Sequence, residues 1–262
     1  MKITRYQDSK GNIHFAADGK RLTGDLFGKF TVTNETADVR KLLAPLVPTA
    51  ILCIGANYRR HIEETGHKVP EYPVLFMKQP AAVQNPGDPV LLPRHLRSDE
   101  VDYECELAVV IGKSCKNVKR DQALSYVFGY TAANDISARD WQLKKGGSQW
   151  CRGKTFDTFC PLGPCITLTD EIPDPNTLRL STRINGEVRQ DWNTNDMLFN
   201  VPTLIEFLSG GMTLMPGTVI LTGTPHGVGM AHTPPKWLKA GDTMTVEIEK
   251  IGQLTNPVED EK

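Results

Sequence analysis

Hydrophobic residues recur along most of the chain with the two-residue period of strands rather than the longer period of helices. Short alternating or continuously apolar runs predict strands at 2–6, 12–17, 50–55, 74–79, 102–113, 242–252 and the start of 218–229. The run LRLSTRINGEVRQ, at 178–190, predicts a hairpin, because Asn-Gly favours the tight turn that joins two antiparallel strands.

Helical patterns are fewer and shorter. They predict helices at 38–46, 57–67, 138–147 and 201–211, of which the first is stopped by prolines and the last two by glycines. Strands and helices do not alternate regularly, which argues against a doubly wound sheet. We therefore expect an α+β fold that is mainly β, with a small N-terminal unit at 1–48 and a larger domain at 49–262.

The most informative strand is 102–113, DYECELAVVIGK. Because side chains alternate between the faces of a strand, one face is wholly apolar, with Tyr103, Cys105, Leu107, Val109 and Ile111. The other face begins with Glu104 and Glu106 and continues with Ala108 and Val110. Two carboxylates on a strand that is apolar on both faces are costly unless a proton or a cation neutralises them.

A divalent metal ion would neutralise this pair, and carboxylate oxygens suit Mg²⁺, Mn²⁺ or Ca²⁺. The alternative is an edge strand with one wet end. Asp135 is the best third ligand, because it follows a predicted strand and precedes the 138–147 helix. Its alternative role is an N-terminal cap of that helix. Open coordination positions would take substrate oxygens, with the metal as a Lewis acid.

Composition and charge limit the classes of function. The chain has 262 residues, of which 39% are hydrophobic and 23% charged, so a packed core is expected. A net charge of -1 gives no footprint for nucleic acid, and no apolar run reaches the roughly 20 residues of a membrane span. The six cysteines form no CxxC pair and favour small buried side chains. We expect a cytoplasmic protein.

Two further groups could carry chemistry. His61 and Glu64 lie three residues apart in the mostly charged segment 57–67, where one helical face would make them a general base with its partner on a mobile lid. Lys154 leads into an apolar stretch and could pair with an anionic substrate. Arg139 and Gln142 share a helical face near Asp135. Each could instead be a surface or structural residue.

Taken together, six phrases make the chain resemble the fumarylacetoacetate hydrolase family, and within it the branch called fumarylacetoacetate hydrolase domain-containing protein 2. They occur in the family's order between about residues 50 and 257: GANYRRHIEE, VDYECELAVVIGK, NDISARDWQ, GKTFDTFCPLGP, NGEVRQ and LTGTPHGVG. The resemblance implies a mixed β-sandwich or β-roll core with short helices, and a homodimer.

The resemblance also implies roles for individual residues. It places Mg²⁺ or Mn²⁺ on Glu104, Glu106 and Asp135. It puts His61 and Glu64 on a lid and Lys154 in the pocket. It makes Arg139, Gln142 and Thr224 substrate-binding residues.

The implied substrate is a small 2-keto acid or β-dicarbonyl acid that reacts through a metal-stabilised enolate. Hydrolysis of a C–C bond and keto–enol tautomerisation of oxaloacetate are the expected reactions. Oxaloacetate decarboxylation and dienoate isomerisation are alternatives within the family. A non-catalytic metal-binding domain is a further alternative, although it would leave His61 and Lys154 without a role.

Overall fold

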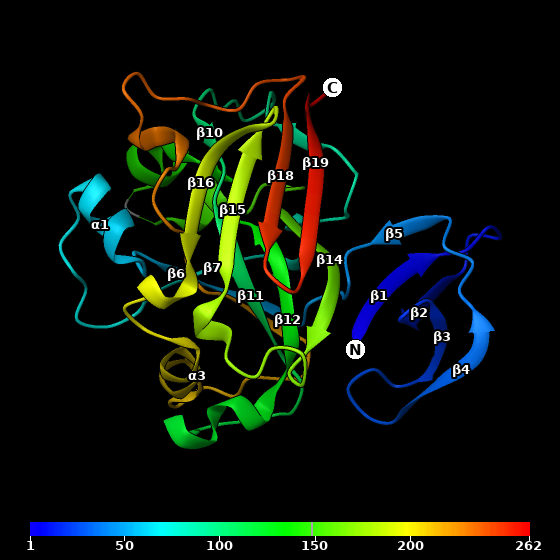
Figure 1. Ribbon diagram of the computed structural model, residues 1–262. Coiled ribbons are helices and arrows are strands. Elements are labelled where there is room, and N and C mark those ends of the chain that lie inside the picture. The colour runs from blue at the N-terminus through cyan, green and yellow to red at the C-terminus, as the bar shows by residue number, and fades with distance from the viewer. Residues whose placement is uncertain (148) are drawn as a thin grey trace.

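The computed structural model describes residues 1–147 and 149–262, and strands dominate it (Figure 1). The largest sheet has twelve strands. Its main path runs in the order β4 (Phe30–Thr36), β3 (Lys20–Gly24), β2 (Ile13–Ala17), β1 (Lys2–Gln7), β14 (Cys160–Leu168), β12 (Val127–Asn134), β11 (Cys105–Ile111), β17 (Thr218–Leu221), β6 (Ala50–Gly55) and β7 (Val74–Lys78). β5 (Lys41–Leu43) pairs with β1, and β8 (Val83–Gln84) pairs with β14.

Two smaller sheets complete the strands. Five strands run in the order β16 (Glu187–Asn193), β15 (Arg179–Ile184), β18 (Thr243–Ile248), β19 (Gly252–Asp260) and β9 (Val90–Leu92). A short pair is formed by β10 (Val101–Asp102) and β13 (Ser137–Ala138). The expected fold class, mainly β with mixed sheets, is confirmed.

The helices are short, as expected. The α-helices of the described residues are α1 (Arg59–Thr65), α2 (Cys151–Lys154) and α3 (Val201–Ser209). Short helices of other types are η1 (Pro80–Ala82), η2 (Arg120–Tyr126), η3 (Asp140–Lys145), η4 (Pro175–Thr177), η5 (Thr194–Asp196) and η6 (Gly229–Ala231). Within the described parts of the chain, no helix has the length and apolar character that crossing a membrane requires.

The core lies on both faces of β11, whose seven residues are all buried. One face, with Leu107 and Val109, packs against α3 and the five-stranded sheet, which lies in front of β11 in Figure 1. The other face, with Ala108 and Val110, packs against residues of β6 and β17. Each fully buried side chain of this size contributes about 1.5–3 kcal/mol, so the strand that starts with the carboxylates is strongly fixed.

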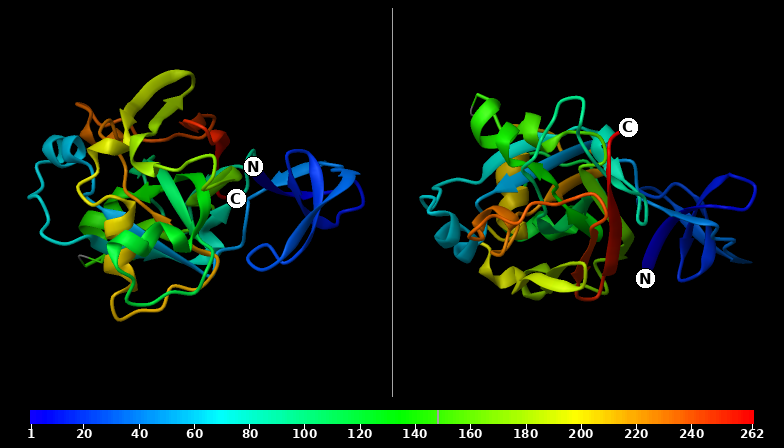
Figure 2. Two further views of the ribbon diagram at one scale, coloured as in Figure 1. Left: turned by 60° about the horizontal axis from the view of Figure 1, so that its bottom comes forward. Right: turned by 90° about the horizontal axis from the view of Figure 1, so that it is seen from above.

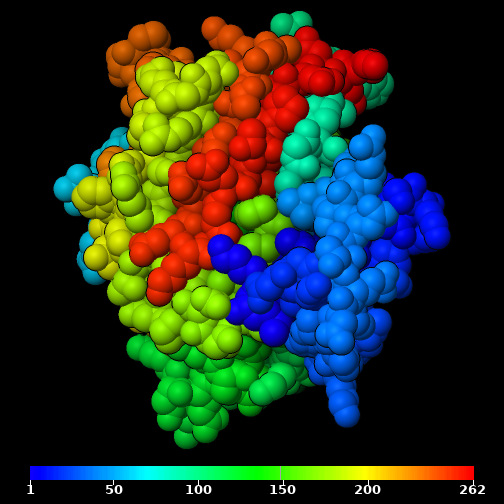
Figure 3. All heavy atoms as spheres, turned by 45° about the vertical axis from the view of Figure 1, so that its right-hand side comes forward, coloured from blue at the N-terminus to red at the C-terminus, as the bar shows by residue number. Residues whose placement is uncertain are grey.

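The N-terminal strands form a lobe beside the rest of the molecule (Figures 2 and 3). The lobe continues the large sheet through β1, where Ile3 pairs with Ile166 of β14. The helix expected at 38–46 is wrong, because Lys41–Leu43 is the strand β5 and pairs with β1. The backbone partner in β1 is distant in sequence, and strand pairing with it overrides the local helical pattern.

The helix expected at 138–147 is also only partly present. Its first residue belongs to β13, and Asp140–Lys145 forms a wide π-helical turn. The backbone of Gly153 lies against this turn. Only glycine fits there, since a Cβ would lie only 2.5 Å from the backbone nitrogen of Gln142. The α2 helix therefore packs directly on the π turn, and such turns are frequent at functional sites.

The hairpin and two helices follow the sequence prediction closely. Asn185 and Gly186 have φ angles of 53° and 82°, as a type I′ turn requires at both central positions. The helices α1 and α3 lie inside the ranges 57–67 and 201–211 that the pattern predicts. Of these, α1 stands over the pocket that is described next.

Candidate active site

Three buried carboxylates meet where β11 begins and β12 ends. Cys105 pairs with Asn134 across these antiparallel strands, and the backbone nitrogen of Asp135 donates to the carbonyl of Glu104 at 2.9 Å. One carboxylate oxygen from each of Glu104, Glu106 and Asp135 lies within 4.8 Å of the other two. Strand pairing thus brings together the three residues that the sequence predicts as metal ligands.

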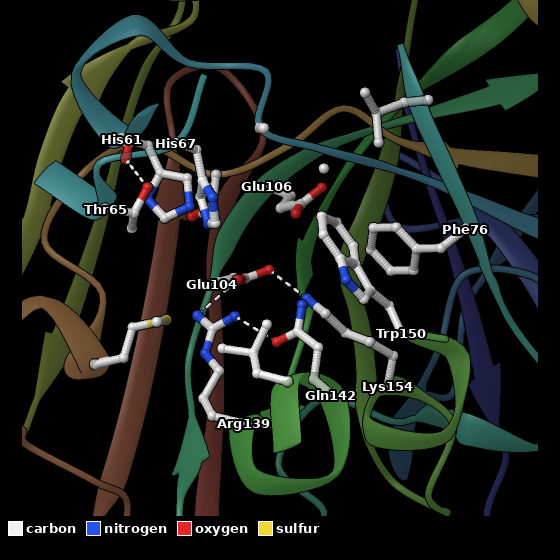
Figure 4. Close-up of a pocket in the computed structure, with 16 residues that line it drawn as sticks. His61, Thr65, His67, Phe76, Glu104, Glu106, Arg139, Gln142, Trp150 and Lys154 are labelled. Atoms are coloured by element: carbon white, nitrogen blue, oxygen red, sulfur yellow. Dashed lines mark hydrogen bonds and ion pairs between the residues drawn. The ribbon is translucent and has the colours of Figure 1, made fainter. Parts of the chain in front are cut away.

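Two buried lysines contact this cluster. The Nζ of Lys154 lies 2.7 Å from Glu104 Oε2 (Figure 4). It also lies 2.8 Å from Asp135 Oδ2. The Nζ of Lys78 lies 2.5 Å from Asp135 Oδ1, and it also donates to the carbonyls of Ile136 and Lys154. Each lysine is only 1% exposed. Although burial opposes its charge, the carboxylates of Asp135 and Glu104 raise the pKa of Lys154.

The sequence argument missed Lys78. A usable signal was its place in the strand VLFMK, where Lys78 shares a face with Phe76. Both side chains are buried, and a charged residue on the inward face of a strand requires a charged or hydrogen-bonding partner. That partner, Asp135, comes from a distant segment, so the strand pattern alone could not name it.

Arg139 supplies the third cation. Its Nη2 lies 2.7 Å from Glu104 Oε1 and 2.9 Å from Asp102 Oδ2. Its Nη1 donates to Gln142 Oε1 at 2.9 Å, so the pair that was expected to share a helical face is in direct contact (Figure 4). Asp102 also accepts hydrogen bonds from the backbone nitrogens of Gly229 and Met230.

The charges of this network balance only if one carboxyl group is protonated or a further cation binds. Four buried carboxylates face three buried cations, the fourth carboxylate being Asp102. Burial opposes ionisation of Glu104, but Lys154 and Arg139 outweigh it and lower the pKa of Glu104 to about 2. For Glu106, burial and then the charges of Asp135 and Glu104 raise the pKa well above its ordinary value. An all-oxygen donor set in which the Glu106 carboxyl has no buried cation of its own among the described residues fits a hard divalent cation, which would take the place of the proton.

The alternative role of Asp135 as a helix cap is not found. The residue before the π turn is Arg139, and no side chain caps that turn. The alternative of a wet edge strand does not hold for the carboxylates either, because Glu104 and Glu106 are 5% and 1% exposed. All six cysteines are free. Cys151 is half-buried and lines a different surface hollow, beside Met77 and Thr155.

The helix α1 covers the pocket from the opposite side. His61 Nδ1 lies 2.8 Å from Glu64 Oε1, and Glu64 also accepts hydrogen bonds from the backbone nitrogen of Gly227. Because a carboxylate can only accept, Nδ1 carries the hydrogen of this contact, and in the neutral form of the ring Nε2 has the lone pair. His61 lines the same pocket as Glu104, Glu106 and Lys154 (Figure 4).

The remaining pocket wall is polar on one side and aromatic on the other. Thr224 lines it beside Arg139 and Gln142. Phe76 and Trp150 form the aromatic side, with ring centroids 5.6 Å apart. Sequence reasoning did not select either aromatic residue, and a signal for Trp150 was weak because its neighbours form no periodic pattern.

Comparison with known proteins places these features in context. The family described as Fumarylacetoacetate (FAA) hydrolase C-terminal matches residues 50–259. The mitochondrial oxaloacetate tautomerase of Xenopus laevis is 50% identical over 218 residues, which are 83% of this chain and 68% of that protein.

Two solved structures align over the full length of this chain. A 5-carboxymethyl-2-hydroxymuconate delta-isomerase from Mycobacterium smegmatis is 39% identical with a TM-score of 0.86, and the alignment covers 100% of both chains. A fumarylacetoacetate hydrolase from Exiguobacterium antarcticum is 38% identical with a TM-score of 0.87, again over 100% of both chains.

The expectation of a cytoplasmic protein is contradicted, because the tautomerase relative from Xenopus laevis is named as mitochondrial. That expectation rested on net charge, the lack of an apolar run of membrane-spanning length and the cysteine content. Charge and free cysteines describe the folded domain, and they do not distinguish one reducing compartment from another.

Proposed function

Since the chain belongs to the fumarylacetoacetate hydrolase family and is therefore an enzyme, we propose that it catalyses the keto–enol tautomerisation of oxaloacetate. One observation carries this proposal: Glu104, Glu106 and Lys154, which belong to a buried cluster of three carboxylates and two lysines, line one pocket together with His61, whose ring pairs with Glu64. The name of the Xenopus laevis relative supplies the substrate and the reaction. A dianionic keto acid also suits a pocket that contains Lys154 and Arg139.

We propose that Glu104, Glu106 and Asp135 hold one Mg²⁺ or Mn²⁺ ion. Support comes from their proximity, their all-oxygen chemistry and the excess of one buried carboxyl group over the buried cations. Such an ion, when bound, polarises a 2-oxo group and stabilises enolate charge. Lys78 contacts Asp135 Oδ1 and Arg139 contacts Glu104 Oε1, and these contacts would fix the orientation of both carboxylates.

The protein's own residues would then bind the substrate and move its proton. Lys154 places positive charge in the pocket, where the anion develops during the reaction. Arg139, Gln142 and Thr224 offer donors to the substrate carboxylates from the polar wall. His61 takes the proton from the methylene carbon at Nε2 and returns it to oxygen, while Glu64 holds Nδ1.

A second candidate is hydrolysis of an acylpyruvate, which the full-length likeness to a fumarylacetoacetate hydrolase favours. The same pocket would serve if His61 activated a water beside a distal carbonyl instead of meeting carbon. The two reactions differ in their products. Tautomerisation conserves the mass of the substrate, whereas hydrolysis releases pyruvate and a second acid.

The test is a substrate panel. Oxaloacetate and several acylpyruvates are followed by ultraviolet absorbance with Mg²⁺, with Mn²⁺ and after chelation, and products are identified by mass. Metal-dependent equilibration of the oxaloacetate enol at unchanged mass is the expected result. Release of pyruvate from an acylpyruvate would favour the second candidate, and release of carbon dioxide from oxaloacetate would indicate decarboxylation. A chain that converts none of them contradicts the proposal.

We also propose that the enzyme is a homodimer that associates through β7. This strand is the edge of the large sheet, and Leu75 and Met77 on it are 41% and 47% exposed. Exposed apolar side chains on an unpaired strand edge favour association. Light scattering should give twice the mass of 29.1 kDa, and Met77→Glu should shift it toward the monomer.

We propose further that residues 1–48 form a unit of their own beside the catalytic domain at 49–262. The family match starts only at residue 50, and the lobe has a small apolar cluster that includes Ile3, Leu22 and Leu26. Truncation of 1–48 should leave the carboxylate cluster intact, and metal binding by the truncated chain tests this.

A further inference from the structure

Gln190 is a buried side chain at the back of the pocket wall, and no part of the reaction just described uses it. It lies in β16, is 1% exposed, and makes four hydrogen bonds. Its Oε1 accepts from the backbone nitrogen of Cys105 at 3.0 Å and from the hydroxyl of Thr182 at 2.8 Å. Its Nε2 contacts Thr224 Oγ1 and the carbonyl of Pro225, each at 2.8 Å.

These partners fix which end of the amide is oxygen and which is nitrogen. The backbone N–H of Cys105 can only donate, so the atom that it contacts must be the amide oxygen. The carbonyl of Pro225 can only accept, so the atom that it contacts must be the amide nitrogen. The orientation of the Gln190 amide therefore follows from two backbone groups that have no choice of role.

The fixed amide in turn decides what the hydroxyl of Thr224 can do. Because Nε2 of Gln190 is a donor, Thr224 Oγ1 must accept from it. The hydroxyl hydrogen of Thr224 is then not needed for this contact, and the described residues provide it with no hydrogen-bond acceptor. Thr224 is 4% exposed and lines the pocket with Glu106, Arg139 and Lys154.

We propose that Gln190 is a positioning residue that makes Thr224 a dedicated hydrogen-bond donor to the ligand. At this point of the wall the pocket then selects an accepting oxygen, such as one of a carboxylate or a carbonyl, over a donating N–H group. The inference rests on the proposed function, because it takes the ligand to be a keto acid.

The variant Gln190→Glu reverses the arrangement with little change of shape. One carboxyl oxygen still accepts from Cys105 and Thr182, while the other replaces the amide nitrogen. Whether it is ionised or carries a proton that it donates to the carbonyl of Pro225, this oxygen has no hydrogen left for Thr224. The hydroxyl of Thr224 must then donate to residue 190 instead of to the ligand. We expect the dissociation constant of oxalate, measured calorimetrically with Mg²⁺ present, to rise about tenfold or more, as for loss of a hydrogen bond to a charged group.

A double-mutant cycle separates this effect from simple repulsion between the new carboxylate and an anionic ligand. Thr224→Val should weaken oxalate binding by a similar factor, and Thr224→Ser should restore it. If Gln190 acts through Thr224, Gln190→Glu has no further effect in the Thr224→Val background. If both effects multiply in the double variant, repulsion or a general distortion is the cause and the proposal is wrong.

Two further measurements complete the test. For oxaloacetate, the KM of Gln190→Glu should rise while kcat stays near the wild-type value, which a structural disturbance of the carboxylate cluster would not produce. If Gln190→Glu does not fold, Gln190→Met replaces it in the cycle: it also removes the fixed donor, and its effect must likewise vanish in the Thr224→Val background. Additive effects again overturn the proposal.

The outcomes for the wild type keep this inference distinct from the proposed function. A wild-type enzyme that neither converts oxaloacetate nor binds oxalate contradicts the proposed function and, with it, the role of Gln190. A wild-type enzyme that does both, but whose cycle is additive, contradicts the role of Gln190 alone.

Discussion

The two sides of the pocket are built in opposite ways. On the sheet side, all seven residues of β11 are buried, and three buried cations contact Glu104, which precedes β11, or Asp135, which follows β12. On the lid side, α1 also has seven residues, but only His61 and Ile62 are buried, and no side chain caps its N-terminus. The carboxylates proposed to hold the metal thus lie in the core, and His61, which is proposed to move the proton, lies on a short and mostly exposed helix.

This difference predicts where substitutions affect stability and where they affect only the reaction. Buried ion pairs depend on both partners, since removing one leaves an uncompensated charge in a medium of low polarity. A short exposed helix contributes little to global stability and can open locally. Each prediction below tests one side against the other.

The largest effect is expected at Lys78. Lys78→Met leaves Asp135 Oδ1 without its cation, and should lower the free energy of unfolding by about 3–5 kcal/mol. The matched control is Lys144→Met, since Lys144 pairs with Glu100 but is 62% exposed at its side chain and should cost no more than about 1 kcal/mol. Urea denaturation of the metal-free proteins measures both. An equal loss of unfolding free energy in the two variants would show that the buried ion pair of Lys78 stabilises the fold no more than an exposed one.

His61 tests the lid side. His61→Ala should lower kcat by about 10²–10⁴, because loss of a general base acts on the transition state. Metal affinity and stability should stay close to wild type, since α1 holds none of the three carboxylates. His67→Ala is the control: it lines the same pocket, yet it belongs to no histidine–carboxylate pair among the described residues. Wild-type turnover by His61→Ala would contradict the mechanism.

Glu106 should separate metal binding from folding on the sheet side. Burial and the charges of Asp135 and Glu104 raise its pKa, so a neutral glutamine is a close substitute in the metal-free protein. Glu106→Gln should therefore weaken Mn²⁺ binding by at least about 10–100-fold while leaving the metal-free unfolding free energy unchanged. Calorimetric titration and urea denaturation give the two values. Retained metal affinity would remove Glu106 from the ligand set.

Glu104 should make the stability of the metal-free protein depend on pH. Its pKa is lowered to about 2 from 4.5, so its contribution to stability is complete above pH 4.5 and is lost as the pH falls toward 2. The advantage of the wild type over Glu104→Gln should shrink by about 1.4 kcal/mol for each pH unit below the upper value. Denaturation of both metal-free proteins at several acidic pH values measures this, and a constant difference would contradict it.

The smallest change is expected in the free energy of local opening of residues 57–69, the proposed lid. Backbone hydrogen exchange over residues 57–69 should slow when oxalate and Mg²⁺ are added, because the segment has few apolar contacts of its own. Exchange in β11 should not change, since it is buried in either state. Equal protection of the lid with and without ligand would mean that α1 is held permanently, for example by the contact of Glu64 with Gly227.

Local patterns were sufficient for much of the fold. Alternation of apolar residues predicted the strand that contains β11, and Asn185-Gly186 predicted the hairpin of β15 and β16. Both signals depend on neighbouring residues alone. The segments 38–46 and 138–147 were mispredicted or only partly right, since β5 pairs with β1 and the π turn packs on α2. Those partners are distant in sequence and cannot be seen in a local pattern.

The same distinction holds for the site. The carboxylates could be selected from the sequence because two of them interrupt an apolar strand. Lys78 and Gln190 could not, since their importance comes from the groups that they contact: Gln190 bonds to Cys105, which is 85 residues away, and Lys78 bonds to Asp135. The roles of all these residues in catalysis remain predictions that the variants above test.

The weak attachment of α1 has a consequence for how such an enzyme can change over generations. Substitutions on α1 that introduce a new base, or a different partner for the base, change the free energy of unfolding little. Most such variants therefore remain stable enough to pass selection. The carboxylate side, by contrast, tolerates few substitutions. Similar chains are named as a tautomerase, an isomerase and a hydrolase. A fixed carboxylate cluster combined with a helix α1 that tolerates substitution would let one fold acquire such different reactions.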